Sequence, residues 1–436
     1  MLNRFLFKQI DNSALIVFRI IFGLLCFLES VGAIFTGWVK KTLVEPHFTF
    51  NFIGLEWLQP LPGNGMYLYY TFMGLFGLFV MLGYRYRISI IAFTLMWSGT
   101  YLMQKSSYNN HYYLLMLLSG IMVFQPAHKY LSLDAKRNAS IASISMPQWC
   151  SWVFILQMFI VYSYASINKI YPDWVNLNVM KTLMEDKKNY FLIGGLLQEQ
   201  WLQYFLAYGG ILFDGLIIPF LLMKKTRKYA FFTSIFFHLF NSFVFQIGIF
   251  PYLSLAFTLF FFSKETIHNI FLKKKPFYNK GEITLPKNYK LFKSIFIAYF
   301  IVQVILPIRH HFIKSDVFWT EEGHRLSWRM MLRTKQGFAT YTVKDNSTGK
   351  KEIIKLSDFL SPKQQNAAST KPDVIWQFAQ HLKDFYQQKG QDVSVYVSSN
   401  VSLNGGKFTP LIDPTIDLTK VPWEPFKHSD WILPEN

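Results

Sequence analysis

Long apolar segments recur along the first three hundred residues and constrain the fold more than any other feature. A helix needs about 20 apolar residues to cross the hydrocarbon core of a bilayer. Nine segments approach that length, some of them short: 13–35, 65–83, 88–104, 111–126, 148–168, 201–223, 229–247, 251–263 and 291–308. Because lipid offers no partners to an open backbone, the sequence predicts a mainly α, polytopic transmembrane helical bundle of about nine spans. No small-residue cleavage site follows the first segment, so it is predicted to be a retained span.

Charge and aromatic content agree with a membrane protein. The net charge is +18, and 19% of the residues are aromatic, a load typical of lipid-facing helices with interfacial belts. The basic residues are dispersed over short loops, which disfavours nucleic acid as a partner. Most of these basic residues lie in segments on the same side as the N-terminus, 18 against seven, so the positive-inside rule predicts a cytoplasmic N-terminus and an outer C-terminal region.

The character of the chain changes after residue 308. Residues 337–343 and 351–356 alternate like strands around a turn-rich stretch at 345–349, which predicts a hairpin. A helical pattern follows from Pro372 to Gly390, and Val393, Val395 and Val397 alternate as a further strand. We therefore expect a transmembrane domain over 1–308 and a small α+β domain over 309–436 on the outer face.

Metal and phosphate chemistry find little support in the sequence. Two cysteines, Cys26 and Cys150, lie in apolar segments, and there is no HExxH or paired-cysteine motif. The glycine pairs at 63–65 and 209–210 lack the lysine and spacing of phosphate-binding loops. We predict no metal cofactor.

One lysine stands at the end of the fifth span. Lys169 follows the apolar segment and precedes Pro172, where the helix would leave the membrane. Loss of hydration at an apolar boundary favours the neutral amine, which can act as a base near neutral pH. The commoner alternative is a snorkelling lysine whose head simply reaches water.

Three histidines accompany this lysine. His111 starts the fourth span and His310 ends the ninth, both at the predicted outer surface with Lys169, as a shared pocket would require. His238 lies about midway through the seventh span, with Asn241 on the same helix face. Each has an alternative: His111 can be an interfacial aromatic, Asn109 and Asn110 can cap a helix, and His238 with Asn241 can join helices by hydrogen bonds. Asp214, Arg19 and Glu29 are costly intramembrane charges that pairing among themselves would explain.

Several motifs together resemble the vitamin K-dependent gamma-glutamyl carboxylases, including a short bacterial type with an HTTM membrane domain. The resemblance covers nearly the whole chain in the family's order, and its motifs are Met66–Tyr70, Met81–Ser89, Ser107–His111, Asn168–Trp174, Phe237–Ser242, Ser327–Met331, Ile412–Leu418 and Trp423–Phe426. The Asn-Asn-His and Lys-x-x-x-Asp-Trp elements are the most specific of these.

The resemblance implies a coupled reaction at the membrane. In that family a lysine, matched here by Lys169, deprotonates vitamin K hydroquinone; oxygen addition and collapse to the epoxide then yield a strong base. That base removes a γ-proton from a protein glutamate, and the carbanion captures carbon dioxide. Asn110 and His111 match family residues beside the quinone, and Asn109, His238 and Asn241 complete the predicted cofactor site.

The resemblance also implies a substrate surface and a location. His310, Trp328, Met330, Met331 and Lys407 occupy places near the family's glutamate-binding surface, with His311 as a competitor of His310 in the alignment. The expected substrates are phylloquinol or menaquinol, O2, CO2 and a secreted Glu-containing protein or peptide. The expected location is the inner membrane of a bacterial cell, or the endoplasmic reticulum membrane in an animal.

Two departures from the family leave alternatives open. Animal members extend well beyond this C-terminus and carry a disulfide between their membrane and lumenal parts, which Cys26 and Cys150 cannot reproduce. The chain is then a carboxylase with epoxidase activity, an epoxidase without efficient carboxylation, or a non-catalytic membrane protein that binds or transports a lipid or quinone. An inverted repeat, which would favour transport, is not evident in the sequence.

Overall fold

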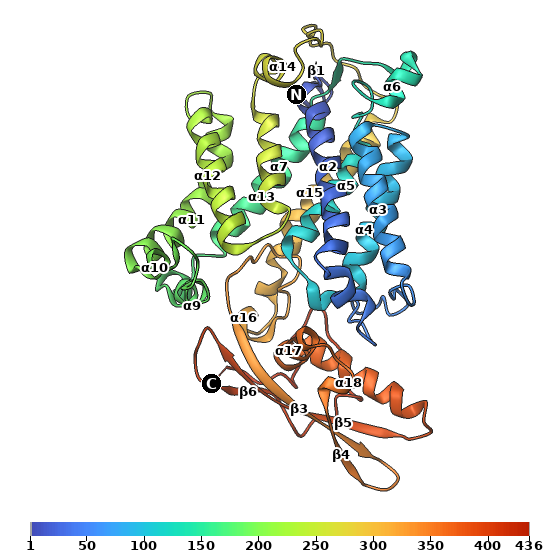
Figure 1. The fold of residues 1–436 in the computed structure, drawn as a ribbon, viewed down its shortest axis with the longest axis vertical. Coiled ribbons are helices and arrows are strands. Elements are labelled where there is room, and N and C mark those ends of the chain that lie inside the picture. Colours follow the sequence, from blue (N-terminus) through green and yellow to red (C-terminus); the bar gives the residue numbers. More distant parts are fainter. Residues whose placement is uncertain (1, 436) are drawn as a thin grey trace.

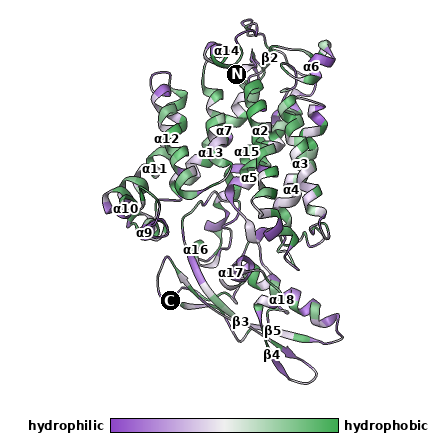
Figure 2. Ribbon diagram, in the orientation of Figure 1, coloured by the Kyte–Doolittle hydropathy of each residue, from purple (hydrophilic) through white to green (hydrophobic). Residues whose placement is uncertain are grey.

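The computed structural model describes residues 2–435 and shows a helical bundle with a smaller mixed region at one end (Figure 1). Helices form at all nine predicted segments: α2 (Ser13–Phe35), α3 (Gly65–Leu82), α4 (Tyr86–Met103), α5 (Asn110–Phe124), α7 (Trp149–Ile167), α11 (Gln200–Leu222), α12 (Arg227–Phe245), α13 (Phe250–Phe257) and α15 (Tyr289–Ile308). Figure 2 shows that apolar residues dominate this bundle, whereas polar residues gather in the loops and the C-terminal region.

Five of these helices are long and apolar enough to cross a membrane by themselves. They are α2, α3, α7, α11 and the helix that begins at Tyr289. Helices α5 and α13 are apolar but short, and α4 and α12 do not reach the same combination of length and hydropathy. The membrane character of the bundle is thus supported, while the predicted count of nine spans is not confirmed.

Close packing of α2 against α3 depends on glycine. A Cβ atom placed on Gly23 would lie 2.2 Å from the backbone nitrogen of Met81, and one on Gly77 would lie 2.7 Å from the nitrogen of Phe27. Small residues at such crossings let two backbones approach, which strengthens the van der Waals packing that holds membrane helices together. The two helices therefore form the tightest pair in the bundle.

The end of the bundle near the N-terminus lies opposite the C-terminal region (Figure 1). Strand β1 (Gln9–Asp11) pairs with β2 (Ser145–Pro147), and Asp11 accepts hydrogen bonds from the Lys275 ammonium at 3.0 Å and from the backbone nitrogen of Tyr278 at 3.0 Å. This carboxylate ties the start of the chain to the segment before α15. Shorter helices complete the bundle: α1 (Leu2–Leu6), α6 (Leu133–Arg137), α8 (Pro172–Val175), α9 (Asn178–Glu185), α10 (Gly194–Gln198), α14 (Lys264–Phe271) and α16 (Val317–Thr320).

The C-terminal region is a four-stranded antiparallel sheet with two helices. Its strand order is β4-β3-β5-β6, and its elements are β3 (Lys335–Asp345), β4 (Lys351–Ile354), α17 (Pro362–Thr370), α18 (Pro372–Gln387), β5 (Val393–Leu403) and β6 (Thr409–Ile412). Tyr341 pairs with Ile354 across the predicted hairpin, and Phe378 of α18 packs on the Tyr341 ring. The predicted hairpin, helix and strand are all present.

Buried ionic contacts join this region to the bundle. The Lys105 ammonium, just after the C-terminal end of α4, lies 2.9 Å from the Asp373 carboxylate at the start of α18, and Arg325 also pairs with Asp373. Burial lowers the pKa of Lys105 to about 8, against the opposing attraction of Asp373. Burial alone would raise the pKa of Asp373, but the two neighbouring cations bring it below its ordinary value. The buried cations and the buried carboxylate therefore stabilise each other, and removal of either would leave an unpaired buried charge.

Candidate functional site

A cavity of about 560 Å³ lies against α11 and α12. Its walls are mostly apolar, with phenylalanine the commonest residue, and several polar side chains interrupt them, including Lys169, Asp214, His111 and Asn241. Several of its lining side chains are also strongly exposed on the apolar surface of the bundle, among them Phe205, Leu212 and Phe236. The cavity is therefore reachable from the side that a bilayer would cover.

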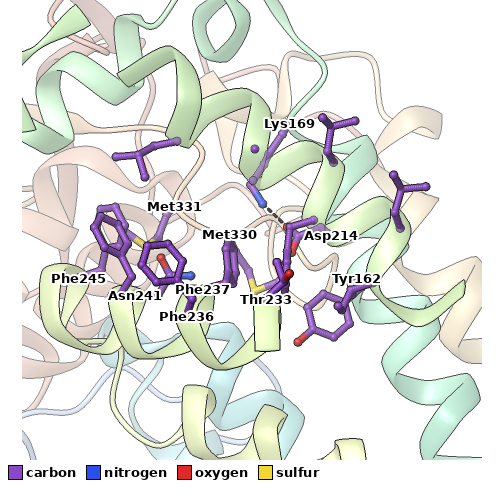
Figure 3. A pocket seen from close by; sticks show the side chains of 18 of the residues that line it. Tyr162, Lys169, Asp214, Thr233, Phe236, Phe237, Asn241, Phe245, Met330 and Met331 are labelled. Atoms are coloured by element: carbon purple, nitrogen blue, oxygen red, sulfur yellow. Dashed lines mark hydrogen bonds and ion pairs between the residues drawn. The ribbon is translucent and has the colours of Figure 1, made fainter. Parts of the chain in front are cut away.

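Lys169 occupies the short link between α7 and α8. Tyr171 is extended, as expected for a residue before proline, so the α7 helix ends and Pro172 opens α8. The Lys169 side chain is 12% exposed and its ammonium pairs with the Asp214 carboxylate of α11, which is 6% exposed (Figure 3). It also lies 5.6 Å from the centre of the Trp174 ring. This lysine is thus held inside the cavity and does not snorkel to open water.

His111 contributes to the same cavity from the first turn of α5. Its ring stacks on Phe250 of α13 with centroids 4.7 Å apart, and its Nδ1 atom has no hydrogen-bond partner within residues 2–435. A buried polar nitrogen without a partner is costly in a protein interior. His111 is therefore placed to accept or donate a hydrogen bond to a molecule in the cavity.

The two asparagines before His111 have structural contacts. The Asn109 side chain accepts a hydrogen bond from the backbone nitrogen of Tyr112 at 2.8 Å, which caps α5. The buried Asn110 amide donates to the backbone carbonyl of Arg329 at 2.9 Å and accepts from the Tyr108 hydroxyl at 2.9 Å. Neither asparagine is among the residues that line the cavity. Asn110 instead holds the segment around Arg329, which follows the last helix of the bundle.

His238 and Asn241 separate in the structure although they share one face of α12. The His238 Nε2 atom lies 2.9 Å from the Tyr162 hydroxyl of α7, so this pair joins two helices as the simpler sequence interpretation expects. Asn241 lines the large cavity, and His238 lines a much smaller one. Their predicted role in cofactor binding remains a prediction.

A strained segment brings two of the predicted substrate residues to the cavity. Between residues 321 and 331 the backbone has positive φ at Glu321, Leu326, Trp328 and Met331, a conformation that costs about 1–3 kcal/mol each for residues with side chains. Trp328 is 1% exposed and stacks on the Tyr113 ring at 4.8 Å. Met330 and Met331 line the cavity with Lys169. Such strain persists where surrounding contacts determine the backbone, which is common at functional sites.

The remaining predicted residues lie at different distances from this cavity. His310 is buried, with Nδ1 2.9 Å from the Pro307 carbonyl and Nε2 3.0 Å from the Arg329 guanidinium. Lys407 is exposed in the loop between β5 and β6 and is not among the lining residues of the cavity. The structure therefore brings Lys169, His111, Asn241, Met330 and Met331 together at the cavity. The predicted residues that do not line it are Asn109, Asn110, His238, His310, Trp328 and Lys407.

The intramembrane charges do not pair as the sequence suggested. Arg19 donates to the backbone carbonyls of Ala127, Tyr130 and Leu131, which lie in the loop between α5 and α6. Glu29 lies in a separate small cavity. Asp214 pairs with Lys169, so the expectation that these three charges pair among themselves is wrong. Asp214 was not predicted as a site residue; the signal that could have found it is a carboxylate within an apolar span, which marks a functional site by default.

Comparison with known families agrees with this geometry. Residues 7–265 match the HTTM domain model, and residues 288–436 match the lumenal domain of vitamin K-dependent gamma-carboxylase. No solved structure matches the chain. The first match covers the helices around the cavity, and the second includes the strained segment at its edge. The chain therefore belongs to the vitamin K-dependent gamma-carboxylase family.

Proposed function

We propose that this protein couples oxygenation of vitamin K hydroquinone to carboxylation of protein glutamate, with Lys169 as the base. The observation that carries the proposal is the Lys169–Asp214 pair at a polar position of an otherwise apolar cavity that also contains His111. Family membership implies a vitamin K cofactor and suggests Glu-containing substrates. The proposal adds the epoxidase step and the roles of particular residues.

The cavity suits an isoprenoid quinol. Such a molecule has a long apolar chain and a polar ring, and the cavity offers mostly apolar walls with Lys169, Asp214, His111 and Asn241 among its polar groups. Exposed lining residues on α11 and α12 give a lipid-dissolved molecule a lateral route. When bound, reduced vitamin K reacts with O2 and supplies the strong base that removes the γ-proton of glutamate.

Three residues of the cavity would carry out the proton transfer at the Lys169 amine. Lys169 in its neutral form accepts a proton from a hydroxyl group that reaches its Nζ atom. Asp214 pairs with the resulting ammonium and balances its charge within the apolar walls. The unpartnered Nδ1 atom of His111 orients the same ring by a hydrogen bond. Apolar walls exclude water, which would otherwise quench a strong base.

The second substrate, a Glu-containing peptide, binds from the side of the C-terminal region. We propose that a Glu-containing peptide approaches past the strained segment, where Trp328, Met330 and Met331 lie, with His310 behind them. Lys407 contributes at most long-range attraction, because it stands apart from the cavity. In this arrangement 1–308 is the membrane domain and 309–436 the outer domain, in a bacterial inner membrane or an endoplasmic reticulum membrane.

The test uses purified protein in detergent with vitamin K hydroquinone, O2, labelled CO2 and a short Glu peptide. We expect both epoxide and labelled peptide from the wild type and neither from Lys169→Ala. Lys181→Ala is the matched control, since Lys181 is an exposed lysine on α9 with no ion pair in the described residues, and it should retain both products. Epoxide without labelled peptide would identify an epoxidase-only relative, and neither product from the wild type would leave a binding protein.

A further inference from the structure

A buried arginine beside the cavity has no acidic partner. Arg329 is 7% exposed, and within residues 2–435 no side-chain carboxylate lies within 4 Å of its guanidinium. Two arginines close to it in sequence are paired: Arg325 with Asp373, and Arg333 with Glu321 at 2.9 Å. Burial of an unpaired charge is expensive, so such a group is retained where a ligand completes it.

The contacts of Arg329 leave one edge of its guanidinium free. Its Nη1 atom donates to the Asn168 side-chain oxygen at 3.2 Å and lies 3.0 Å from the Nε2 atom of His310. The buried Nε atom has no partner in the described residues, and none of their groups accepts a hydrogen bond from Nη2. Nε and Nη2 form the edge that binds both oxygens of a carboxylate in parallel hydrogen bonds.

The surroundings fix the position of this edge. The guanidinium carbon lies 4.2 Å from the centre of the Phe318 ring, and the Asn110 amide holds the Arg329 carbonyl. Burial lowers the pKa of Arg329 to about 10; Arg333 acts in the same direction, and Asp316 and Glu321, which lie beyond ion-pair distance, oppose it, so the side chain remains charged at neutral pH. The group is thus a fixed cation whose direction is already set before any ligand arrives.

Arg329 adjoins the cavity through two separate segments. Met330 and Met331, which follow it in the chain, line the cavity, and Asn168, which contacts its Nη1 atom, precedes Lys169. Arg329 is not itself a lining residue, but the two residues after it in the chain and the residue after its Asn168 partner all are. We propose that Arg329 binds the side-chain carboxylate of the glutamate in an acidic peptide and thereby selects Glu over Gln.

This inference rests on the proposed function for its substrate, but binding can be measured without chemistry. The probe is a short peptide with blocked termini and one Glu, so that its only carboxylate is the side chain, compared with the same peptide carrying Gln. Affinities are measured by fluorescence anisotropy on the Lys169→Ala protein, which the proposed mechanism makes inactive. A charge-assisted pair predicts that the Glu peptide binds about tenfold to a hundredfold more tightly than the Gln peptide.

Variants at Arg329 test whether this residue causes the preference for the Glu peptide. Arg329→Gln should bind both peptides equally, and Lys314→Gln, which removes an exposed cation of the same region, should keep the preference for Glu. Arg329→Lys keeps the charge but loses the paired donors, so we expect an intermediate preference if Arg329→Gln does not fold. Equal binding of the two peptides to a protein with Arg329 intact, or an unchanged preference in both Arg329 variants, would overturn the assignment.

The two proposals fail differently. If Lys169 is not the base, the Lys169→Ala protein still forms epoxide, but the Glu preference and its dependence on Arg329 persist. If Arg329 does not bind the carboxylate, the preference is absent or insensitive to Arg329 while epoxide formation still depends on Lys169.

Discussion

The Lys169–Asp214 pair predicts a specific pattern of stabilities when its two members are replaced by apolar residues. Both side chains are nearly buried in apolar walls, and each is the other's only hydrogen-bond partner in the described residues. Lys169→Met leaves an uncompensated carboxylate and should cost about 3–5 kcal/mol. Asp214→Leu leaves the Lys169 amine, which is more exposed than the carboxylate (12% against 6%), so its cost should be smaller.

The double variant should recover most of this loss. Replacing a buried ion pair by apolar residues of similar volume is often neutral or stabilising, by up to about 4 kcal/mol. At roughly 2 °C per kcal/mol, the unfolding midpoint of Lys169→Met should lie about 6–10 °C below that of the wild type. The midpoint of the double variant should lie close to that of the wild type. Thermal unfolding of detergent-solubilised protein, followed by tryptophan fluorescence, measures this pattern.

Activity should follow the opposite pattern. All three variants lack either the base or its partner, so the double variant should be stable but should form no epoxide. A pair kept only for stability would give a double variant at least as unstable as Lys169→Met. That result, or a Lys169→Met protein as stable as the wild type, would refute the view that the pair is retained for chemistry.

Three further predictions concern the frame around the cavity. Asn109→Ala removes the cap of α5 and should lower stability by about 1 kcal/mol in thermal unfolding, without changing the KM for quinol. Gly23→Ala forces a Cβ against the α3 backbone and should cost about 1–3 kcal/mol, whereas Gly120→Ala, where the space is open, should not destabilise the bundle. Asp373 has a pKa below its ordinary value, so its contribution is complete above the unfolded value of about 3.9 and is lost as the pH falls below it. Unfolding midpoints measured down to pH 3 should therefore fall steeply for the wild type and less for Asp373→Asn.

Much of the fold follows from local patterns in the sequence. Apolar segments of sufficient length placed helices at all nine predicted positions, and alternation around 345–349 placed the hairpin of β3 and β4. These signals are short in range, because span length and strand periodicity are properties of consecutive residues. The contact between Lys105 and Asp373 has no such signal, since 268 residues separate the two partners.

The candidate site was predictable only in part, for the same reason. Lys169 and His111 stand at ends of apolar segments, and both line the cavity that the structure forms. The partner of Lys169 could not be chosen from sequence, because Asp214, Arg19 and Glu29 offered several pairings and only the helix packing decides among them. Arg329 lies within a recognisable motif, but its lack of an acidic partner is visible only once all neighbours are placed.

The central claim is that the Lys169 amine starts the chemistry of a bound quinol. The most direct measurement is the rate of epoxide formation by Lys169→Ala at saturating vitamin K hydroquinone and O2, with bound quinol quantified in the same sample. We predict that binding is retained while the rate falls by about 10²–10⁴, the usual contribution of a positioned base. Epoxide formed at the wild-type rate by the quinol-loaded variant would contradict the account.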